Sequence, residues 1–274
     1  MNHRAAPRPW VILLAILVLS VPFFVLGTLS NVRFMPGLPL SALMFLCTAA
    51  VAFWVAWRTG GLAGMRTLLG RVFDARRARP WTWNLVAALV FPAVLLVEYA
   101  VMLAANMPLP SPQIPWLQAP VLFALLFVGA ACEEVAWSAT LLEPVQERVG
   151  ALGAGLLIGA FAALWHLIPF WQAHPSVSWV LGQFLFTVAF RIVLAWIYNV
   201  SGYSLFAAVV CHAAYNTAWQ LFPNQGSGYS PWITAAITWV VVGVVVTIFG
   251  SRTLGSRTLG SRTLAGRHPT EVSN

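Results

Sequence analysis

Two adjacent carboxylates stand at the end of a long uncharged stretch, and they are the first residues in the chain that could do chemistry. Glu133 and Glu134 follow the apolar run PVLFALLFVGAAC. Placing an ionised carboxylate in hydrocarbon costs several kcal/mol or more unless its charge is compensated. Because the sequence contains no lysine, the pair needs a shared proton, a metal ion, a bound water or partners from other helices.

Four further ionisable residues lie inside apolar stretches, and such groups are functional candidates because each must be paired or hydrated. They are Glu98, His166, Arg191 and His212. His212 and Asn216 are four residues apart and therefore share one helical face. An imidazole and an amide in this arrangement can direct two hydrogen-bond donors at one point, as the oxyanion of an acyl-transfer intermediate requires.

Residue counts from two expected turns bring these groups to comparable depths. Glu134 lies sixteen residues before Gly150 and His166 sixteen residues after it, so antiparallel helices would place both at one level. Arg191 and His212 flank the next expected turn by eleven and ten residues. At 1.5 Å per residue the two levels differ by about 9 Å. They coincide if the polar segment before Gly150 projects into water by that amount.

The composition is that of an integral membrane protein. Of 274 residues, 60% are hydrophobic and 8% are charged, whereas soluble domains carry about 25% charged residues. We therefore predict an all-α fold over residues 1–250, a polytopic transmembrane helical bundle of about eight spans. A G-x-x-x-G pattern at Gly155 and Gly159 predicts close packing against a neighbouring helix. Spans need about 20 apolar residues, and the stretches that qualify are 10–29, 38–57, 82–106, 117–146, 151–171, 178–200, 203–222 and 230–250.

The distribution of the arginines predicts the orientation in the membrane. Arg4 and Arg8 precede the first span, six arginines lie in the linker 58–80, Arg148 follows the fourth span and four arginines follow the eighth. With eight spans these segments share one side, which the positive-inside rule makes the cytoplasm, together with both termini. Residues 251–274 contain most of three GSRTL repeats and are predicted to form a disordered basic cytoplasmic tail. The net charge of +8 is thus explained without a nucleic-acid partner.

The stretch EEVAWSATLLEPVQERVGALGAGLLIGAFAALWHLIPF, followed by CHAAYN, resembles a known protein family. It is similar to the CPBP family of intramembrane proteases, which includes the CAAX prenyl endopeptidases and the bacteriocin-processing and immunity proteins. The family pattern is Glu-Glu-x-x-x-Arg, then Phe-x-x-x-His, then His-x-x-x-Asn or Asp. The resemblance covers the motif region 131–220. It implies an intramembrane endopeptidase, named a metalloprotease, that hydrolyses a peptide bond with glutamate-activated water.

The resemblance also implies a role for each motif residue. Glu133 is the base that activates water, Glu134 is its partner, and His166 helps to hold the water. His212 and Asn216 form the oxyanion hole, in agreement with their shared helical face. Glu134, His166 and His212 would form an adequate zinc set with an open position. A metal-free water held by Glu and His would serve as well, so the resemblance leaves zinc as an open alternative.

Two positions depart from the family pattern. Ser138 stands where the family has Arg, and Ala162 stands where it has Phe, with Phe161 one residue away. An Arg one helical turn after the acids can hold a carboxylate ionised, whereas Ser donates one hydrogen bond and carries no charge. Arg191, at the level of His212, is the candidate for supplying the missing charge from another helix.

Two other classes of function stay open from the sequence. A catalytically inactive relative could act as a membrane scaffold or immunity factor. A proton-coupled transporter could use Glu98, Glu134 and the histidines as a relay, with Glu98 paired to Arg191 or facing a water-filled cavity. The inverted repeats typical of transporters are not found, because the acid pair has no counterpart elsewhere.

The expected partners are membrane lipid and a peptide or protein substrate cleaved near the cytoplasmic face, with no nucleic acid. Arginine without lysine and an abundance of Ala, Leu, Val and Gly favour a GC-rich bacterium. The expected location is therefore a bacterial plasma membrane.

Overall fold

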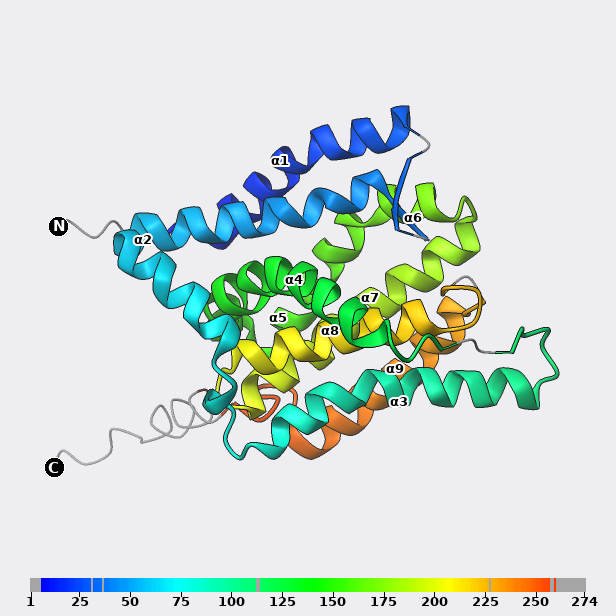
Figure 1. The fold of residues 1–274 in the computed structure, drawn as a ribbon. Coiled ribbons are helices and arrows are strands. Elements are labelled where there is room, and N and C mark those ends of the chain that lie inside the picture. The colour runs from blue at the N-terminus through cyan, green and yellow to red at the C-terminus, as the bar shows by residue number, and fades with distance from the viewer. Residues whose placement is uncertain are drawn as a thin grey trace, which may run out of the picture.

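The computed structural model of the chain describes residues 6–30, 32–35, 37–111, 114–226, 228–256 and 259, and over these residues the fold is a bundle of helices (Figure 1). One short hairpin, of strands β1 and β2, interrupts the helices. The elements are α1 Pro9–Leu29, β1 Arg33–Met35, β2 Leu38–Pro39, a 3-10 turn Leu40–Met44, α2 Phe45–Phe73, a 3-10 turn Ala75–Arg77, α3 Thr82–Ala104, α4 Ala119–Ala136, a π-helical segment Trp137–Leu142, α5 Glu143–Trp165, α6 Leu167–Ala173, α7 Val177–Val200, α8 Leu205–Leu221 and α9 Pro231–Phe249.

Helix α7 lies at the centre of the bundle because its sequence is apolar on all sides. The segment FTVAFRIVLAWIYN is buried at every position, as expected of a helix without a polar face. Helices α5 and α9 pack along α7, while α3 and α4 pack along α8. The outer helices expose many large apolar side chains, such as Leu96 on α3 and Val240 on α9. These side chains form the surface that lipid would cover.

Close packing of α5 on α7 follows from the predicted pair of small residues. A Cβ atom on Gly155 would lie 3.0 Å from Ile192 Cγ1, and one on Gly159 would lie 3.0 Å from Val188 Cα. Any larger side chain would push the helices apart. The same Cβ on Gly159 would also lie 3.3 Å from the Cβ of Arg191. The G-x-x-x-G pattern therefore fixes the depth at which Arg191 enters the bundle.

The structure confirms the predicted all-α membrane bundle and refines its spans. Six segments of the described residues are long and apolar enough to cross a membrane. The expected spans 117–146 and 151–171 fall mainly in one apolar segment, Ala119–Trp165, which reverses at Gly150 with φ of +79°. The expected span 203–222 corresponds to α8, which has 17 residues and lies mostly buried among other helices. Six segments replace eight expected spans because two of the spans are joined in Ala119–Trp165 and because α8 is short.

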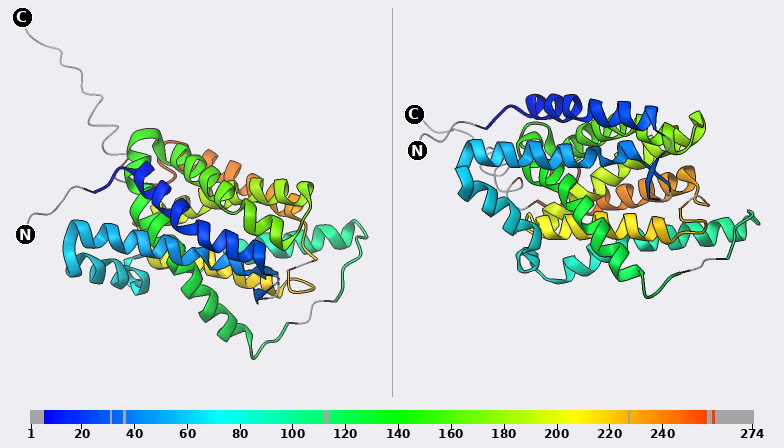
Figure 2. Two further views of the ribbon diagram at one scale, coloured as in Figure 1. Left: turned by 90° about the horizontal axis from the view of Figure 1, so that it is seen from above. Right: turned by 45° about the horizontal axis from the view of Figure 1, so that its top comes forward.

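The arginine-rich connections gather at one end of the bundle. Arg77 donates from Nε to the carbonyl of Gly202 at 3.2 Å, and the backbone N–H of Ala151 donates to the carbonyl of Arg252 at 2.9 Å. The start of α1 and the bend of α2 at Gly61 lie at this same end, as Figures 1 and 2 show, whereas the hairpin lies at the other. We call these two ends the arginine end and the hairpin end.

The linker and the tail differ from the expected boundaries. The linker 58–80 was expected to start after the second span, but α2 continues through its first part as far as Phe73 beyond the bend. Residues 251–256 belong to the folded part, because Leu254 is fully buried and Asn199 Nδ2 donates to the Thr253 carbonyl at 3.2 Å. The predicted disorder of residues 257–258 and 260–274 lies outside the described residues.

Candidate functional site

The acid pair lies at the end of α4, where the helix widens. Glu133 and Glu134 are followed directly by the π-helical segment Trp137–Leu142. Such segments are rare and often occur at functional sites. Beside the acids, Thr48 on α2 donates from Oγ1 to the carbonyl of Cys132 at 2.8 Å and so ties α4 to its neighbour.

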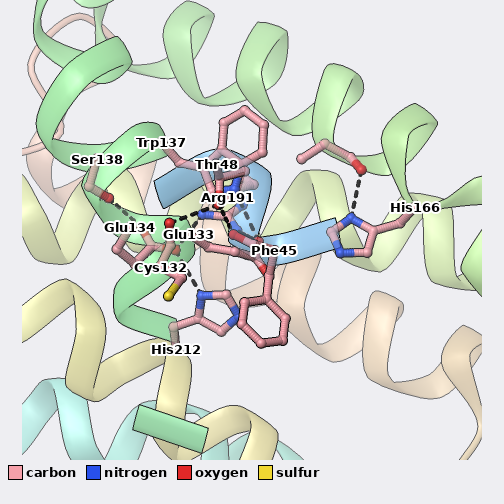
Figure 3. Close-up of polar contacts among 11 residues, drawn as sticks. Phe45, Thr48, Cys132, Glu133, Glu134, Trp137, Ser138, His166, Arg191 and His212 are labelled. Atoms are coloured by element: carbon pink, nitrogen blue, oxygen red, sulfur yellow. Dashed lines mark hydrogen bonds and ion pairs between the residues drawn. The ribbon is translucent and has the colours of Figure 1, made fainter. Parts of the chain in front are cut away.

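Glu134 is fully buried, and both of its oxygens are occupied by donors. Its Oε1 accepts hydrogen bonds from Arg191 Nη1 at 2.5 Å and from His212 Nδ1 at 2.8 Å. Its Oε2 accepts one from Ser138 Oγ at 2.5 Å. Figure 3 shows these groups surrounding the carboxylate. Because every contact donates to the charged form, Glu134 is held as an ionised anchor.

Glu133 differs from its neighbour because only one of its oxygens is occupied. Its Oε2 accepts from Arg191 Nη2 and from Trp137 Nε1, both at 3.0 Å. Within the described part of the chain, Oε1 accepts no hydrogen bond. Glu133 also lines a cavity, whereas Glu134 does not. The structure therefore gives the two acids different environments, as their 100° separation on one helix requires.

Arg191 supplies a cation to both acids from α7. It is 4% exposed, and its guanidinium lies 5.6 Å from the Trp137 ring and 5.5 Å from the Phe190 ring. A planar guanidinium matches this setting because it can donate from separate nitrogens and stack on aromatic faces. The charge expected one turn after the acids thus reaches them from another helix. Ser138, at the motif position, contributes a single hydrogen bond instead.

A cavity of about 620 Å³ lies in front of Glu133. Its polar lining includes His166, His212 and Asn216, so four of the five predicted site residues meet there. The rest of its wall is mainly apolar, with rings and aliphatic chains from several helices and the hairpin. Sequence counting therefore placed these residues correctly in one region, although they come from α4, α8 and the end of α5.

Each histidine is oriented by a hydrogen bond from its Nδ1. His166 Nδ1 lies 2.8 Å from the carbonyl of Ala162, and the ring stacks on Phe170 with centroids 5.2 Å apart. His212 Nδ1 lies 2.8 Å from Glu134, and its ring meets the edge of Phe190. Because a carbonyl and a carboxylate only accept, both Nδ1 atoms carry a proton. In each ring Nε2 is left to contact a ligand.

The zinc set proposed from the sequence does not fit this arrangement. Both oxygens of Glu134 already accept bonds, and the Arg191 cation lies 2.5 Å from one of them. A dication placed there would be repelled by the guanidinium and would displace the existing donors. No group of three or more His, Cys, Asp or Glu residues among the described ones has the spacing of a metal site. Glu134, His166 and His212 are therefore not assigned as metal ligands.

Two contributors to the site, Trp137 and Gln183, were not among the residues expected from the sequence, and the surroundings expected for Glu98 were wrong. Trp137 donates from Nε1 to Glu133 Oε2 at 3.0 Å. Gln183 is 5% exposed, lines the cavity, and its Oε1 has no hydrogen-bond partner among the described residues. Glu98 neither pairs with Arg191 nor lines the cavity. It accepts hydrogen bonds from Ser230 N at 2.7 Å and from Thr234 Oγ1, and so caps α9. The sequence signal for Trp137 is its position one helical turn after Glu133.

The matched family agrees with the motif and with the geometry. Residues 115–218 match the model of the Rce1-like family, described as type II CAAX prenyl endopeptidase Rce1-like. Over these residues the chain is similar to the CAAX-type membrane proteases of the CPBP family, which supports the resemblance of its motifs. The matched family is one of CAAX-type intramembrane endopeptidases, and the apolar helices of the chain support an integral membrane protein. A comparison with curated proteins gives no match.

Proposed function

We propose that this chain hydrolyses a peptide bond in the cavity, with Glu133 as the general base. The observation that carries the proposal is the asymmetry of the acid pair. Glu134 is saturated by three donors, whereas Glu133 faces the cavity with one oxygen unoccupied by any described residue. A base needs a lone pair within reach of the water it activates, and Glu133 alone of the two acids offers one.

In the proposed reaction a water molecule is held between Glu133 Oε1 and His166 Nε2. Glu133 takes a proton from the water while the water oxygen attacks the carbonyl carbon of the substrate. His212 and Asn216 donate hydrogen bonds to the oxyanion that forms. Glu133 then delivers the proton to the departing amine, so that the carboxylate is restored.

The donor role of His212 needs a proton on both ring nitrogens, because Nδ1 already donates to Glu134. Two carboxylates and the Arg191 guanidinium carry a net charge of −1 when the ring is neutral. With both ring nitrogens protonated the cluster is neutral, and the ring donates from Nδ1 to Glu134 and from Nε2 to the oxyanion.

No step of this proposal passes through a metal ion, and the two mechanisms can be separated experimentally. Purified protein in detergent is tested for cleavage of a fluorogenic peptide library, with and without a chelator. We expect cleavage that is unchanged by the chelator. Cleavage that the chelator abolishes and added zinc restores would contradict the metal-free mechanism.

The same assay decides between the protease and the inactive relative. Folded protein that stays silent but gains cleavage as Ser138→Arg would be an inactive member of the family. Silence of both forms across the library would likewise count against catalysis and favour a binding role. Cleavage by the unaltered chain would show that Arg191 replaces the motif arginine in function as well as in position.

Gln183 is proposed to bind the substrate backbone. Gln183 lines a mainly apolar cavity, and its buried Oε1, without a partner among the described residues, can accept a peptide N–H if the side chain turns toward the substrate. We expect Gln183→Leu to raise KM about 3- to 10-fold with little change in kcat, the value of one hydrogen bond. The thermal stability should not fall, since the substitution removes an unsatisfied buried group.

Gln220 provides a matched control for this measurement. It is 8% exposed, and its Oε1 also lacks a partner among the described residues, but it does not line the cavity. Gln220→Leu should therefore leave KM unchanged. Equal changes of KM in the two variants would show that Gln183 acts through general stability rather than through the substrate.

A further inference from the structure

The cavity lies entirely on the hairpin side of the acids. Besides Glu133, its lining comes from β1 and β2 and the segment that follows them as far as Phe45, from α4 between Leu125 and Gly129, from α6, from α7 as far as Arg191 and from the last part of α8. In chain order α7 starts at the hairpin end and α8 finishes there (Figures 1 and 2). No described residue of the connections at the arginine end lines this cavity.

Two contacts place the hairpin beside the ends of α8 and α6. A Cβ atom on Gly37, in the turn between β1 and β2, would lie 2.9 Å from the Trp219 ring near the end of α8. Gln172, near the end of α6, accepts from Ser41 Oγ at 2.5 Å. The hairpin and these two helix ends therefore surround the outer part of the cavity.

The charge distribution distinguishes the two ends. Of the fifteen arginines, Arg33 lies in a hairpin-end connection and Arg191 lies in the middle of the bundle. The other thirteen belong to the terminal segments, to the stretch 58–80 or, as Arg148, to the start of α5. The positive-inside rule places such an end in the cytoplasm. A cytoplasmic arginine end puts the hairpin end, with the outer part of the cavity, on the opposite side.

We propose that the substrate is an apolar peptide segment that reaches Glu133 from the extracytoplasmic face of the membrane. That the bound peptide is a substrate rests on the proposed function, but the direction of access does not depend on catalysis. It replaces the expectation of cleavage near the cytoplasmic face, because the cavity and the arginine end lie at opposite ends of the bundle.

The chemistry of the wall defines the class of substrate. Apolar side chains such as Met35, Phe45 and Phe186 line the cavity, with polar groups concentrated near the acids and at Gln183. Arg191 is the one charged group of the lining besides Glu133 and the histidines, and its guanidinium is already paired. Pockets of this kind bind apolar groups and use a few polar groups for orientation. Acidic or basic side chains of a peptide would lose their hydration there without gaining a partner.

Cysteine labelling in sealed vesicles tests the direction of access. Cys47, Cys132 and Cys211 are first replaced by alanine in the full chain, and folding is checked by gel filtration. Single cysteines are then introduced as Ala173→Cys in the cavity wall and as Val149→Cys, next to Gly150 at the arginine end. A membrane-impermeant maleimide is added to right-side-out and to inside-out vesicles.

We expect Ala173→Cys to react in right-side-out vesicles and Val149→Cys to react in inside-out vesicles. Reaction of both positions from one side, Ala173→Cys reacting only in inside-out vesicles, or no reaction of Ala173→Cys from either side would overturn the proposal. The readout needs no proteolysis. An inactive protein with the expected labelling would contradict the proposed function and leave the direction of access supported.

Protection by peptides tests the occupant in the same preparation. An uncharged Leu/Ala peptide is compared with a peptide of equal length in which alternate residues are Asp and Lys. At about ten times its Kd the apolar peptide occupies about 90% of the sites, so labelling of Ala173→Cys should slow about tenfold. The charged peptide should have no effect. Equal protection by both, or none by either at its solubility limit, would contradict an apolar substrate.

Discussion

Glu133→Gln is expected to lower kcat by about 10²- to 10⁴-fold, the usual contribution of a general base, while the protein stays folded. A glutamine oxygen can still accept from Arg191 and Trp137, which now contact Glu133 Oε2. The amide has no basic lone pair for a water proton. Cleavage rates of the purified variant, measured beside its thermal unfolding, separate the lost chemistry from any lost structure.

The matched control for this change is Glu147→Gln, which makes the same substitution at an exposed position near Gly150, outside the cavity. Its kcat should equal that of the unaltered chain. Glu134→Gln should behave differently from both, since an amide N–H₂ would face one of the groups that now donate to Glu134. We expect that variant to lose stability as well as activity. An unchanged kcat in Glu133→Gln would rule out Glu133 as the base.

Arg191→Gln is expected to have the largest effect on stability. Arg191 is the only arginine that contacts the acids among the described residues, and removing it leaves two carboxylates with no guanidinium partner. Breaking a buried ion pair by removing one partner costs about 3–5 kcal/mol. The midpoint of thermal unfolding in detergent should therefore fall, and cleavage should be lost. A folded and fully active Arg191→Gln would show that the acids do not need this charge.

A second variant keeps this prediction testable if Arg191→Gln does not fold. Ser138→Arg combined with Arg191→Ser returns the cation to the family's motif position on α4. Because Ser138 Oγ already lies 2.5 Å from Glu134, an arginine there is within reach of the acids. We expect partial recovery of folding and cleavage, limited by about 1–3 kcal/mol of overpacking at a site that is 3% exposed. No recovery at all would mean that Arg191 has a role beyond its charge.

The positive charge of the site comes from a residue far from the acids in the sequence. In this chain the charge and the acids lie 57 and 58 residues apart, so they come together only when α4 packs beside α7. The close approach of α5 and α7 at Gly159 fixes the level of Arg191. Packing of α4 beside α7 therefore brings the cation to the acids here, whereas in the family pattern an Arg one helical turn after the acids is expected to do so.

The sequence by itself determined the membrane class, the apolar segments and the order of the polar residues within them. It also located the reversal at Gly150 and matched the depth of Glu134 with that of His166 and the depth of Arg191 with that of His212, since helical rise per residue is constant. These features are local, because each depends on composition or on counting along one helix. They needed no knowledge of which helices touch.

Only the tertiary structure decided which acid faces the cavity, where the compensating charge comes from and at which end the cavity lies. Glu133 and Glu134 are identical in type and adjacent, so their difference arises from the donors that surround them, namely Ser138, Arg191 and His212 around Glu134. The rejected zinc set has the same origin, because the Arg191 contact is invisible in the sequence. Charge compensation in a membrane depends on neighbours from distant segments, and these neighbours are fixed by how the helices pack.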